Sequence, residues 1–226
     1  MKPIFLIIAF TFSTLLFSQE INLELKNELK HILLKDQGFR ELMSGGISEE
    51  RKIDLLKDLS INKKDLDHNF IHLINRNDSL NLVEVEKIIM EFGYPEKSLV
   101  GEPENEAAWF VIQHSNKIEE YFPLIKNAGE KDELKSTKVA MMEDRMLMYR
   151  GEPQIYGTQG KGLHTFNVST NKNDFFYIIW PIKNPENVNE LRKSVGFNTT
   201  VEENAKRMKI EYKVYTIEEV NKLLIN

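Results

Sequence analysis

The sequence predicts an α+β fold that is mainly α-helical: a multi-helix domain with a small antiparallel sheet toward the C-terminus. Before residue 150, apolar residues recur at spacings of three and four, which is the period of one face of an α-helix. Beyond Pro153 the period changes to the alternation of strands, with turn residues between short segments. These two observations divide the chain into a helical part and a part that contains the sheet.

The first two helices have recognisable ends. An apolar stripe begins at Leu25, and Ser44-Gly45-Gly46 stops that helix. Ser48 is placed to cap the second helix, because its hydroxyl can accept a hydrogen bond from a free N–H of the first turn.

Five further helices are expected before residue 150. Their limits follow from apolar periodicity and from the glycines and prolines at their ends. The first two begin near Asp65 and near Leu82, with Gly93-Tyr94-Pro95 as the end of the second, and the others cover about residues 104–116, 116–128 and 132–149. Ala107–Ile112 is apolar on every side, which is typical of a buried central helix.

The part beyond Pro153 is expected to contain a three-stranded antiparallel meander. Its strands would be residues 154–159, 163–169 and 175–182, with Gly160-Lys161-Gly162 and residues 170–173 as turns. A helix over residues 187–195, a strand over 210–215 and a last helix follow. Thr216 and Glu219 predict a capping box at the start of that last helix.

Residues 1–18 are predicted to be a secretory signal peptide. Lys2 gives a positive start, Ile4–Phe17 is almost unbroken apolar sequence, and Ser18 is a small residue at the expected cleavage point. The apolar run is short for a membrane span, and an uncleaved N-terminal anchor is the alternative. We therefore expect an exported protein, periplasmic or extracellular. Residues 19–226 would form a single domain, with its helical part at 19–150 and the sheet and remaining helices at 151–226.

The composition argues against several partners and kinds of site. With 30 Lys and Arg against 35 Asp and Glu, the net charge is −5, which does not provide the basic surface that nucleic acid requires. The absence of cysteine excludes disulfides, cysteine nucleophiles and cysteine metal ligands. His68 and His72 have i,i+4 spacing, but their helix is polar and expected to be exposed, so no metal and no cofactor is expected. No segment after residue 18 has the length and apolarity of a membrane span.

Asp144 and Arg145 interrupt the apolar pattern of the long helix over residues 132–149. Their neighbours at three and four residues are mostly methionine, leucine and alanine, so both charges are expected among apolar side chains. Adjacent helical residues point about 100° apart, so each is expected to have its own partner. Two interpretations remain open: structural ion pairs or caps, and a charged site facing a cleft.

His114 and its neighbour Gln113 form a second polar position, at the end of the apolar helix over 104–116. A single histidine there is either a satisfied core residue or an acid/base group whose orientation the amide fixes. The segment Gln154–Gln159 is a third polar position. Alternation would place Gln154 and Tyr156 on one face and Gln159 on the other, either as a solvated edge strand or as a surface that contacts a ligand.

These segments together resemble a bacterial family described only as domain of unknown function 6624. The resemblance rests on Asp36, Gln37 and Arg40; Gly93-Tyr94-Pro95 and Ser98–Gly101; Trp109, Gln113 and His114; Asp144 and Arg145; Pro153, Gln154, Tyr156, Gly157, Thr158 and Gln159; and Trp180-Pro181 with residues 185–196. It covers about residues 25–196, and the tail from Asn198 lies outside it. This chain departs from the pattern at Asn116, where the family often has an acidic residue. The resemblance implies a shared site but no named reaction.

Three functions are compatible with these residues. The first is an exported hydrolase acting on an envelope or extracellular substrate, with His114 as acid/base and Asp144 and Arg145 as electrostatic elements. Its ligand-binding residues would be Asp36, Gln37, Arg40, Trp109, Gln113, Gln154, Tyr156 and Gln159. The second is a non-catalytic module that uses the same side chains to bind a small molecule, an envelope-derived ligand or a partner. The third is a structural polar network.

Overall fold

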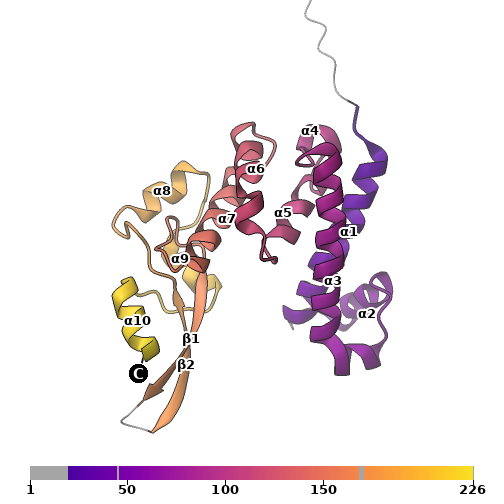
Figure 1. Ribbon diagram of the computed structural model, residues 1–226. Coiled ribbons are helices and arrows are strands. Elements are labelled where there is room, and N and C mark those ends of the chain that lie inside the picture. Colours follow the sequence, from indigo (N-terminus) through magenta and orange to yellow (C-terminus); the bar gives the residue numbers. More distant parts are fainter. Residues whose placement is uncertain (1–19, 45, 168–170, 226) are drawn as a thin grey trace, which may run out of the picture.

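The structure, a computed structural model, describes residues 20–44, 46–167 and 171–225 (Figure 1). The expected signal peptide lies outside the described residues. The elements are α1 (Leu23–Ser44), α2 (Glu49–Asp58), α3 (Lys63–Phe92), α4 (Lys97–Val100), the 3-10 turn η1 (Glu104–Glu106), α5 (Ala107–Ile112), α6 (Ile118–Glu130), α7 (Ser136–Tyr149), β1 (Gly160–Asn167), β2 (Lys172–Ile179), α8 (Val188–Ser194), α9 (Val201–Arg207) and α10 (Ile217–Ile225). This confirms a mainly helical α+β fold with a small antiparallel sheet toward the C-terminus.

The helix caps follow from local side-chain chemistry. Ser48 caps α2 by accepting a hydrogen bond from the Arg51 N–H at 3.2 Å. At α10 the Thr216 hydroxyl accepts from the Glu219 N–H, and the Glu219 carboxylate accepts from the Thr216 N–H. Both caps were predicted from the sequence. The same pattern at Thr200 and Glu203 starts α9, a helix that was not predicted from the sequence.

Two predicted helix boundaries were wrong. The segments expected near Asp65 and near Leu82 are one continuous helix, α3, because the polar run between them contains no glycine or proline to stop it. The helix expected over 104–116 ends at Ile112. There the Ser115 hydroxyl donates to the Ile112 carbonyl at 2.8 Å and terminates the helix, so that His114 lies in a turn.

The largest apolar core lies among the helices. α1 and α3 pack side by side with α5 against both, and α6 packs on α7 (Figure 1). Buried Leu29, Val85, Ile112, Ile125 and Met142 are members of the cluster that joins these helices. Two smaller apolar clusters lie in the C-terminal part, one with Val201 and Ile182 and the other with Leu163 and Trp180. The helical part and the sheet part therefore have separate apolar clusters.

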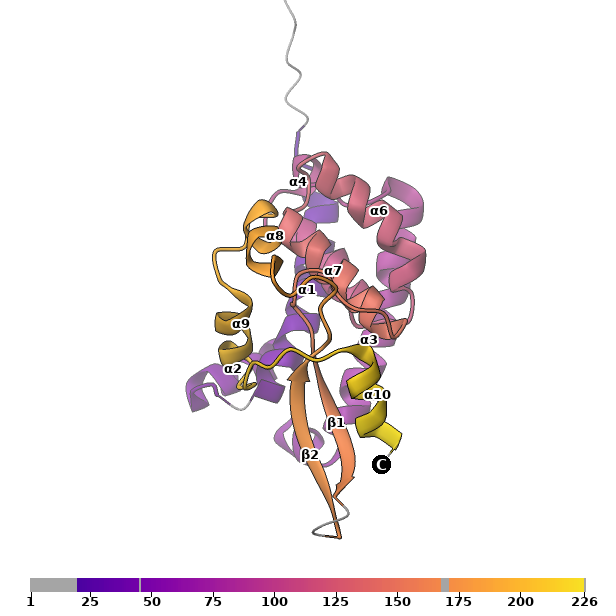
Figure 2. The same ribbon diagram turned by 90° about the vertical axis from the view of Figure 1, so that its left-hand side faces the viewer.

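The sheet has two strands rather than the expected three. β1 and β2 form an antiparallel hairpin with Gly160 opposite Ile179, and α10 packs against β1 (Figure 2). Gly160-Lys161-Gly162 begins β1 and is not a turn. Residues 210–215 form no strand, and their backbone makes no ladder with a neighbour in the described part of the chain.

The segment Gln154–Gln159 is a loop and not the first strand of a meander. Gln154 makes one isolated bridge to Ile182, and the backbone then turns through Gly157 at φ +65°. A Cβ at Gly157 would lie 2.6 Å from Val201 Cγ2, so the close approach that favours glycine here is to protein side chains. We call residues 154–159 the polar loop.

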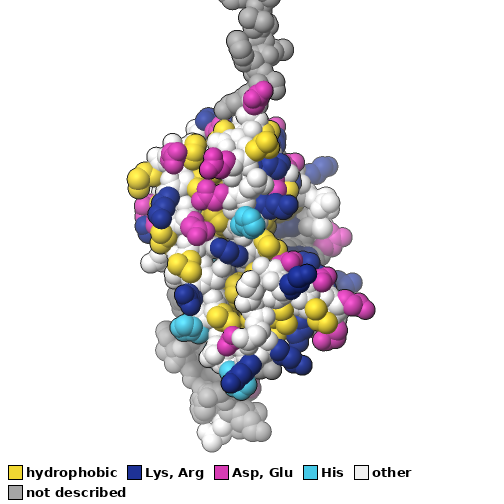
Figure 3. Space-filling view, turned by 90° about the vertical axis from the view of Figure 1, so that its right-hand side faces the viewer, with side chains coloured by type: hydrophobic (Ala, Val, Ile, Leu, Met, Phe, Trp, Pro, Cys, Tyr) yellow, Lys and Arg dark blue, Asp and Glu magenta, His cyan; other side chains and the backbone are white. Residues whose placement is uncertain are grey.

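The surface of the helical part carries both signs of charge. On the face seen from the side of α1 and α3, basic and acidic side chains are interspersed (Figure 3). Among the described residues, no helix has the length and apolarity to cross a membrane.

Candidate functional site

A polar layer interrupts the apolar contact between α1 and α3. The buried face of α1 is apolar apart from Gly38 and Asp36, which is 1% exposed, and buried Asn77 and Asn81 lie one turn apart on α3. The two helices run antiparallel (Figure 1), and Arg40 on α1 pairs with Asp78 on α3. In an antiparallel pair, the residue one turn before Arg40 on α1 lies opposite the turn after Asp78 on α3. Asp36 therefore lies opposite the turn of α3 that contains Asn81. We call Asp36, Asn77 and Asn81 the polar layer.

Each residue of the polar layer has atoms without a hydrogen-bond partner among the described residues. They are Asp36 Oδ1, Asn77 Nδ2 and both Asn81 Oδ1 and Nδ2. An unpaired buried donor or acceptor costs free energy, so such atoms are uncommon and need an explanation. Here they are one carboxylate oxygen, one amide oxygen and two amide nitrogens.

The charge on Asp36 is only partly balanced. Arg40 donates to both oxygens of Asp78 at 2.9 and 2.8 Å, and its guanidinium lies 3.9 Å from Asp36. Burial raises the pKa of the Asp36 carboxyl to about 6, against the opposing effects of Arg40 and of the hydrogen bond from Gln37. Asp36 therefore titrates close to neutral pH.

The turn after α5 brings His114 near two arginines. Partial burial of the ring and the positive charges of Arg40 and Arg145 lower the pKa of His114 to about 3. Part of the side-chain surface is in contact with water, which screens some of this effect, but burial, Arg40 and Arg145 all shift the pKa in the same direction. His114 is therefore a neutral imidazole at pH 7.

Arg145 is a half-buried cation that forms no ion pair with a carboxylate in the described part of the chain. Its Nε donates to Gln159 Oε1 and one terminal nitrogen donates to the Gln113 carbonyl, each at 3.1 Å. Burial lowers the pKa of Arg145, the interaction with the Tyr149 side chain opposes this, and the charge of Arg40 lowers the pKa further. A guanidinium nevertheless stays charged at any physiological pH. We call Arg40, His114 and Arg145 the basic rim.

Asp144 lies away from the basic rim and holds the polar loop. Its carboxylate is fully buried and accepts hydrogen bonds from the N–H groups of Ile155, Tyr156 and Thr158 and from the Thr158 hydroxyl, at 2.7–3.2 Å. Burial raises the pKa of Asp144, and these four donors oppose that rise. The hydrogen-bonding capacity of the carboxylate is thus used mainly by backbone N–H groups. Asp144 and Arg145 therefore have different partners.

Three of the predicted ligand-binding side chains are also occupied by protein groups. Gln154 donates to the Gln159 and Trp180 carbonyls and accepts from the Gln159 N–H. The amide of Gln159 bridges Met141, Thr158 and Arg145. The Trp109 ring is buried, and its N–H donates to the Lys138 carbonyl. These contacts fix the polar loop and the packing of α5 on α7.

The remaining predicted residues divide between the site and its surroundings. The Gln113 side chain is buried beside the basic rim, and only its backbone carbonyl contacts Arg145. Gln37 donates a hydrogen bond to Asp36 and lines an apolar hollow that α1 forms with residues of α2 and of the segment 103–110. Tyr156 lines a cavity on another side of α7. The structure therefore gathers Asp36, Arg40, His114 and Arg145, but not Asp144 or Tyr156.

The sequence reading missed three residues of this site: Asn77, Asp78 and Asn81. A signal was present, because Asn77 and Asn81 have i,i+4 spacing and continue the apolar stripe of α3. The spacing becomes significant only within one continuous helix, whereas the sequence predicted two helices on either side of Asp78. Among residues 20–44, 46–167 and 171–225, no group of three or more histidine and acidic residues is placed to hold a metal ion.

Comparison with known proteins assigns the family. Neither the curated proteins nor the solved structures contain a match to this chain. The model of the Family of unknown function (DUF6624) matches residues 64–216, which is more than half of the chain. The match includes His114, Arg145 and the polar loop and extends into the tail after Asn198, whereas the residues of α1 lie before it. On this extent of match, the chain belongs to the DUF6624 family.

Proposed function

We propose that this protein is exported and binds a small polar molecule with an anionic group, derived from the cell envelope or the extracellular medium. The binding site is the polar layer together with the basic rim. The observation that carries the proposal is Arg145, a half-buried guanidinium beside a second arginine and without a carboxylate partner among the described residues.

The basic rim favours an anion. Arg40 is balanced by Asp78, but among the described residues the charge of Arg145 is met by the oxygens of Gln113 and Gln159 and by the side chain of Tyr149, and by no carboxylate. Two neighbouring like charges repel each other in a partly buried place, and a bound carboxylate or phosphate removes that repulsion. The neutral imidazole of His114 adds a hydrogen-bonding group without adding charge.

The polar layer favours a ligand with hydroxyl or amide groups. Asp36 and Asn81 offer acceptors, and Asn77 and Asn81 offer donors, none of which has a hydrogen-bond partner among the described residues. Sugar acids and amino-acid derivatives carry both an anionic group and such polar groups. Export is supported by the charge and apolar pattern of residues 1–18.

The test is thermal unfolding of the chain from Gln19 with anions and their neutral counterparts. Acetate, inorganic phosphate and N-acetylmuramic acid are compared with acetamide and N-acetylglucosamine. We expect at least one anion to raise the unfolding midpoint of the wild type, because a ligand that binds the folded state stabilises it. Arg145→Gln should abolish this rise.

Arg150→Gln is the matched control. Arg150 is exposed at the end of the same helix and pairs with Glu119, so its loss should leave the response to anions unchanged. An equal response of wild type and Arg145→Gln would show that the basic rim does not hold the anion.

A hydrolase acting on an envelope-derived or extracellular substrate is the second candidate. The observation that favours it is Asp36, whose pKa of about 6 suits a proton donor or acceptor near neutral pH. Asp36→Asn and His114→Gln would then abolish turnover of a substrate that still binds. Binding without turnover in the wild type would leave the non-catalytic function.

A further inference from the structure

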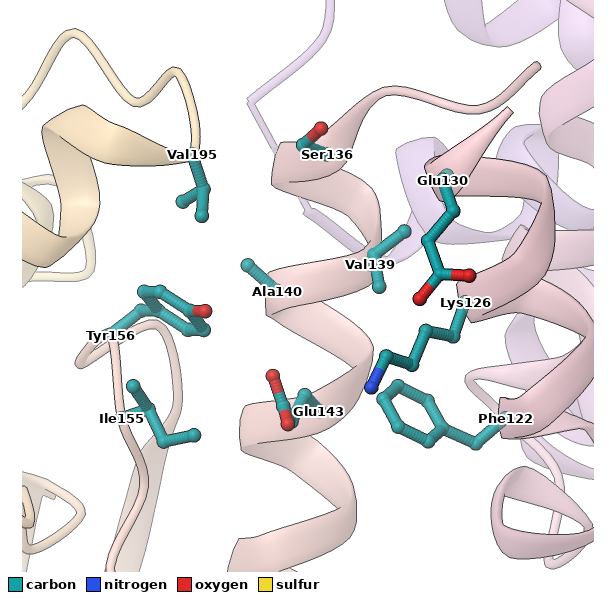
Figure 4. A pocket seen from close by; sticks show the side chains of 11 residues that line it. Phe122, Lys126, Glu130, Ser136, Val139, Ala140, Glu143, Ile155, Tyr156 and Val195 are labelled. Carbon is teal, nitrogen blue, oxygen red and sulfur yellow. The ribbon is translucent and has the colours of Figure 1, made fainter. Parts of the chain in front are cut away.

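The cavity that Tyr156 lines lies on another side of α7, away from the basic rim. It has a volume of about 370 Å³ and is lined by residues of α6, α7, the polar loop and the segment that follows α8 (Figure 4). Glu143, Asp144 and Arg145 are consecutive, so their side chains leave the helix about 100° apart. Glu143 lines this cavity, Asp144 holds the polar loop, and Arg145 belongs to the basic rim.

The Glu143 carboxylate in this cavity is unused by the protein. It is half-buried, and among the described residues it has no hydrogen bond and no ion pair within 4 Å. Burial and the neighbouring charge of Asp144 raise its pKa, and the charge of Lys126 opposes this rise. A positive group placed against Glu143 would compensate for the interactions with water that the carboxylate loses on burial.

Aromatic rings stand on both sides of that carboxylate. Figure 4 shows Tyr156 on the side of the polar loop and Phe122 on the side of α6, with Glu143 between them. Aromatic faces attract cations through the ring quadrupole, and a carboxylate adds a charge-assisted hydrogen bond. Ala140, Val139 and Val195 supply an apolar wall for the rest of a ligand.

We propose that this cavity binds an ammonium group attached to an apolar body, with Glu143 as its counter-charge and Phe122 and Tyr156 as its walls. This cavity is distinct from the site of the polar layer and the basic rim, and it takes a ligand of the opposite charge. Lys126 is exposed and lines the cavity, so its ammonium is a competitor for the same carboxylate.

The experiment is a calorimetric or ligand-observed NMR titration at pH 7.5 with benzylammonium and with neutral benzyl alcohol. Benzylammonium should bind the wild type, and benzyl alcohol should bind more weakly. Glu143→Gln keeps the shape and removes the charge, and we expect it to weaken benzylammonium binding by about tenfold. Lys126→Gln should strengthen the same binding, because it removes the competing cation.

Glu130→Gln is the matched control, since Glu130 is exposed and lines the same cavity. It should change the affinity for benzylammonium by less than about twofold, as expected for an exposed charge. Equal binding of benzylammonium and benzyl alcohol would overturn the proposal. So would an equal loss in Glu130→Gln and Glu143→Gln, because the effect would then come from overall charge and not from Glu143.

Discussion

The carboxyl of Asp36 connects the polar layer to the stability of the whole protein. Its pKa is raised by burial from 3.8 to about 6, which means that the folded state holds this proton more tightly than the unfolded state does. The contribution of Asp36 to the free energy of unfolding is therefore fully present below pH 3.8 and is lost as the pH rises through 6. The difference between the two pKa values corresponds to about 3 kcal/mol.

We accordingly predict that Asp36→Asn is more stable than wild type at pH 8 and that the difference between them shrinks toward pH 4. Urea unfolding of both proteins across this range measures it. His114 acts in the opposite direction, because its lowered pKa costs stability as the pH falls below 6.5, but it is present in both proteins and cancels in the difference. A difference that does not change with pH would mean that Asp36 is not buried as a carboxylate.

The role of Asp144 also shows where sequence reasoning reaches its limit at single residues. A charge among apolar neighbours at helical spacing correctly indicated burial and a partner of its own. The partners are backbone N–H groups eleven to fourteen residues later, and backbone donors leave no mark in a sequence. Spacing alone could not distinguish that structural use from catalysis.

The polar loop is the element that depends on Asp144. Further contacts hold it from the other side, where Arg192 donates to the Tyr156 carbonyl at 2.8 Å and Asn204 donates to the Gly157 carbonyl at 3.0 Å. A loop of this kind needs acceptors for its N–H groups, because its backbone forms only an isolated bridge and no sheet ladder. α7 supplies those acceptors through one side chain.

We predict that Asp144→Asn lowers the free energy of unfolding by roughly 2–4 kcal/mol, because one amide oxygen replaces two carboxylate oxygens and the amide nitrogen meets N–H groups. Chemical denaturation measures this loss. Glu143→Gln is the control on the adjacent position, and since Glu143 makes no hydrogen bond among the described residues, it should change stability by less than about 0.5 kcal/mol. Similar losses in the two variants would contradict the role given to Asp144.

The same element explains the error in the predicted sheet. Alternation of polar residues and a central glycine are shared by an edge strand and by a loop that wraps around a buried carboxylate. The capping residues of α2 and α10 were predictable because each cap is complete within four residues. The polar loop was not, because its partners come from α7, α8 and α9.

At the scale of the molecule, periodicity was sufficient for the class of fold and for most helices, but not for the site. The polar layer joins Asp36 to Asn81 across forty-five residues, and only the packing of α1 on α3 creates it. In the same way, Arg145 on α7 donates hydrogen bonds to Gln113 in the turn after α5 and to Gln159 in the polar loop, so three separate segments of the chain form these contacts. A single sequence contains the residues of such a site, but nothing that places them together.

The whole chain has separate apolar clusters, and its two tryptophans report on two of them. Trp109 lies in the large core of the helical part, and Trp180 lies in the cluster of the hairpin and α10. The polar loop connects the two, because Asp144 holds it from α7 and Gln154 ties it to the Trp180 carbonyl. We therefore predict that the parts unfold together as one cooperative unit.

The measurement uses two proteins with one tryptophan each, Trp109→Phe and Trp180→Phe. In each, urea unfolding is followed by the remaining tryptophan and by far-ultraviolet circular dichroism, and the two midpoints should coincide. Adding Asp144→Asn to Trp109→Phe should move the Trp180 midpoint below that of the helices, because the C-terminal part loses a buried connection to α7 that holds three N–H groups of the polar loop. Separate midpoints in the proteins that keep Asp144 would mean that the sheet part is an independent unit. Coincident midpoints in the Asp144→Asn protein would mean that contacts other than those of Asp144 join the two parts.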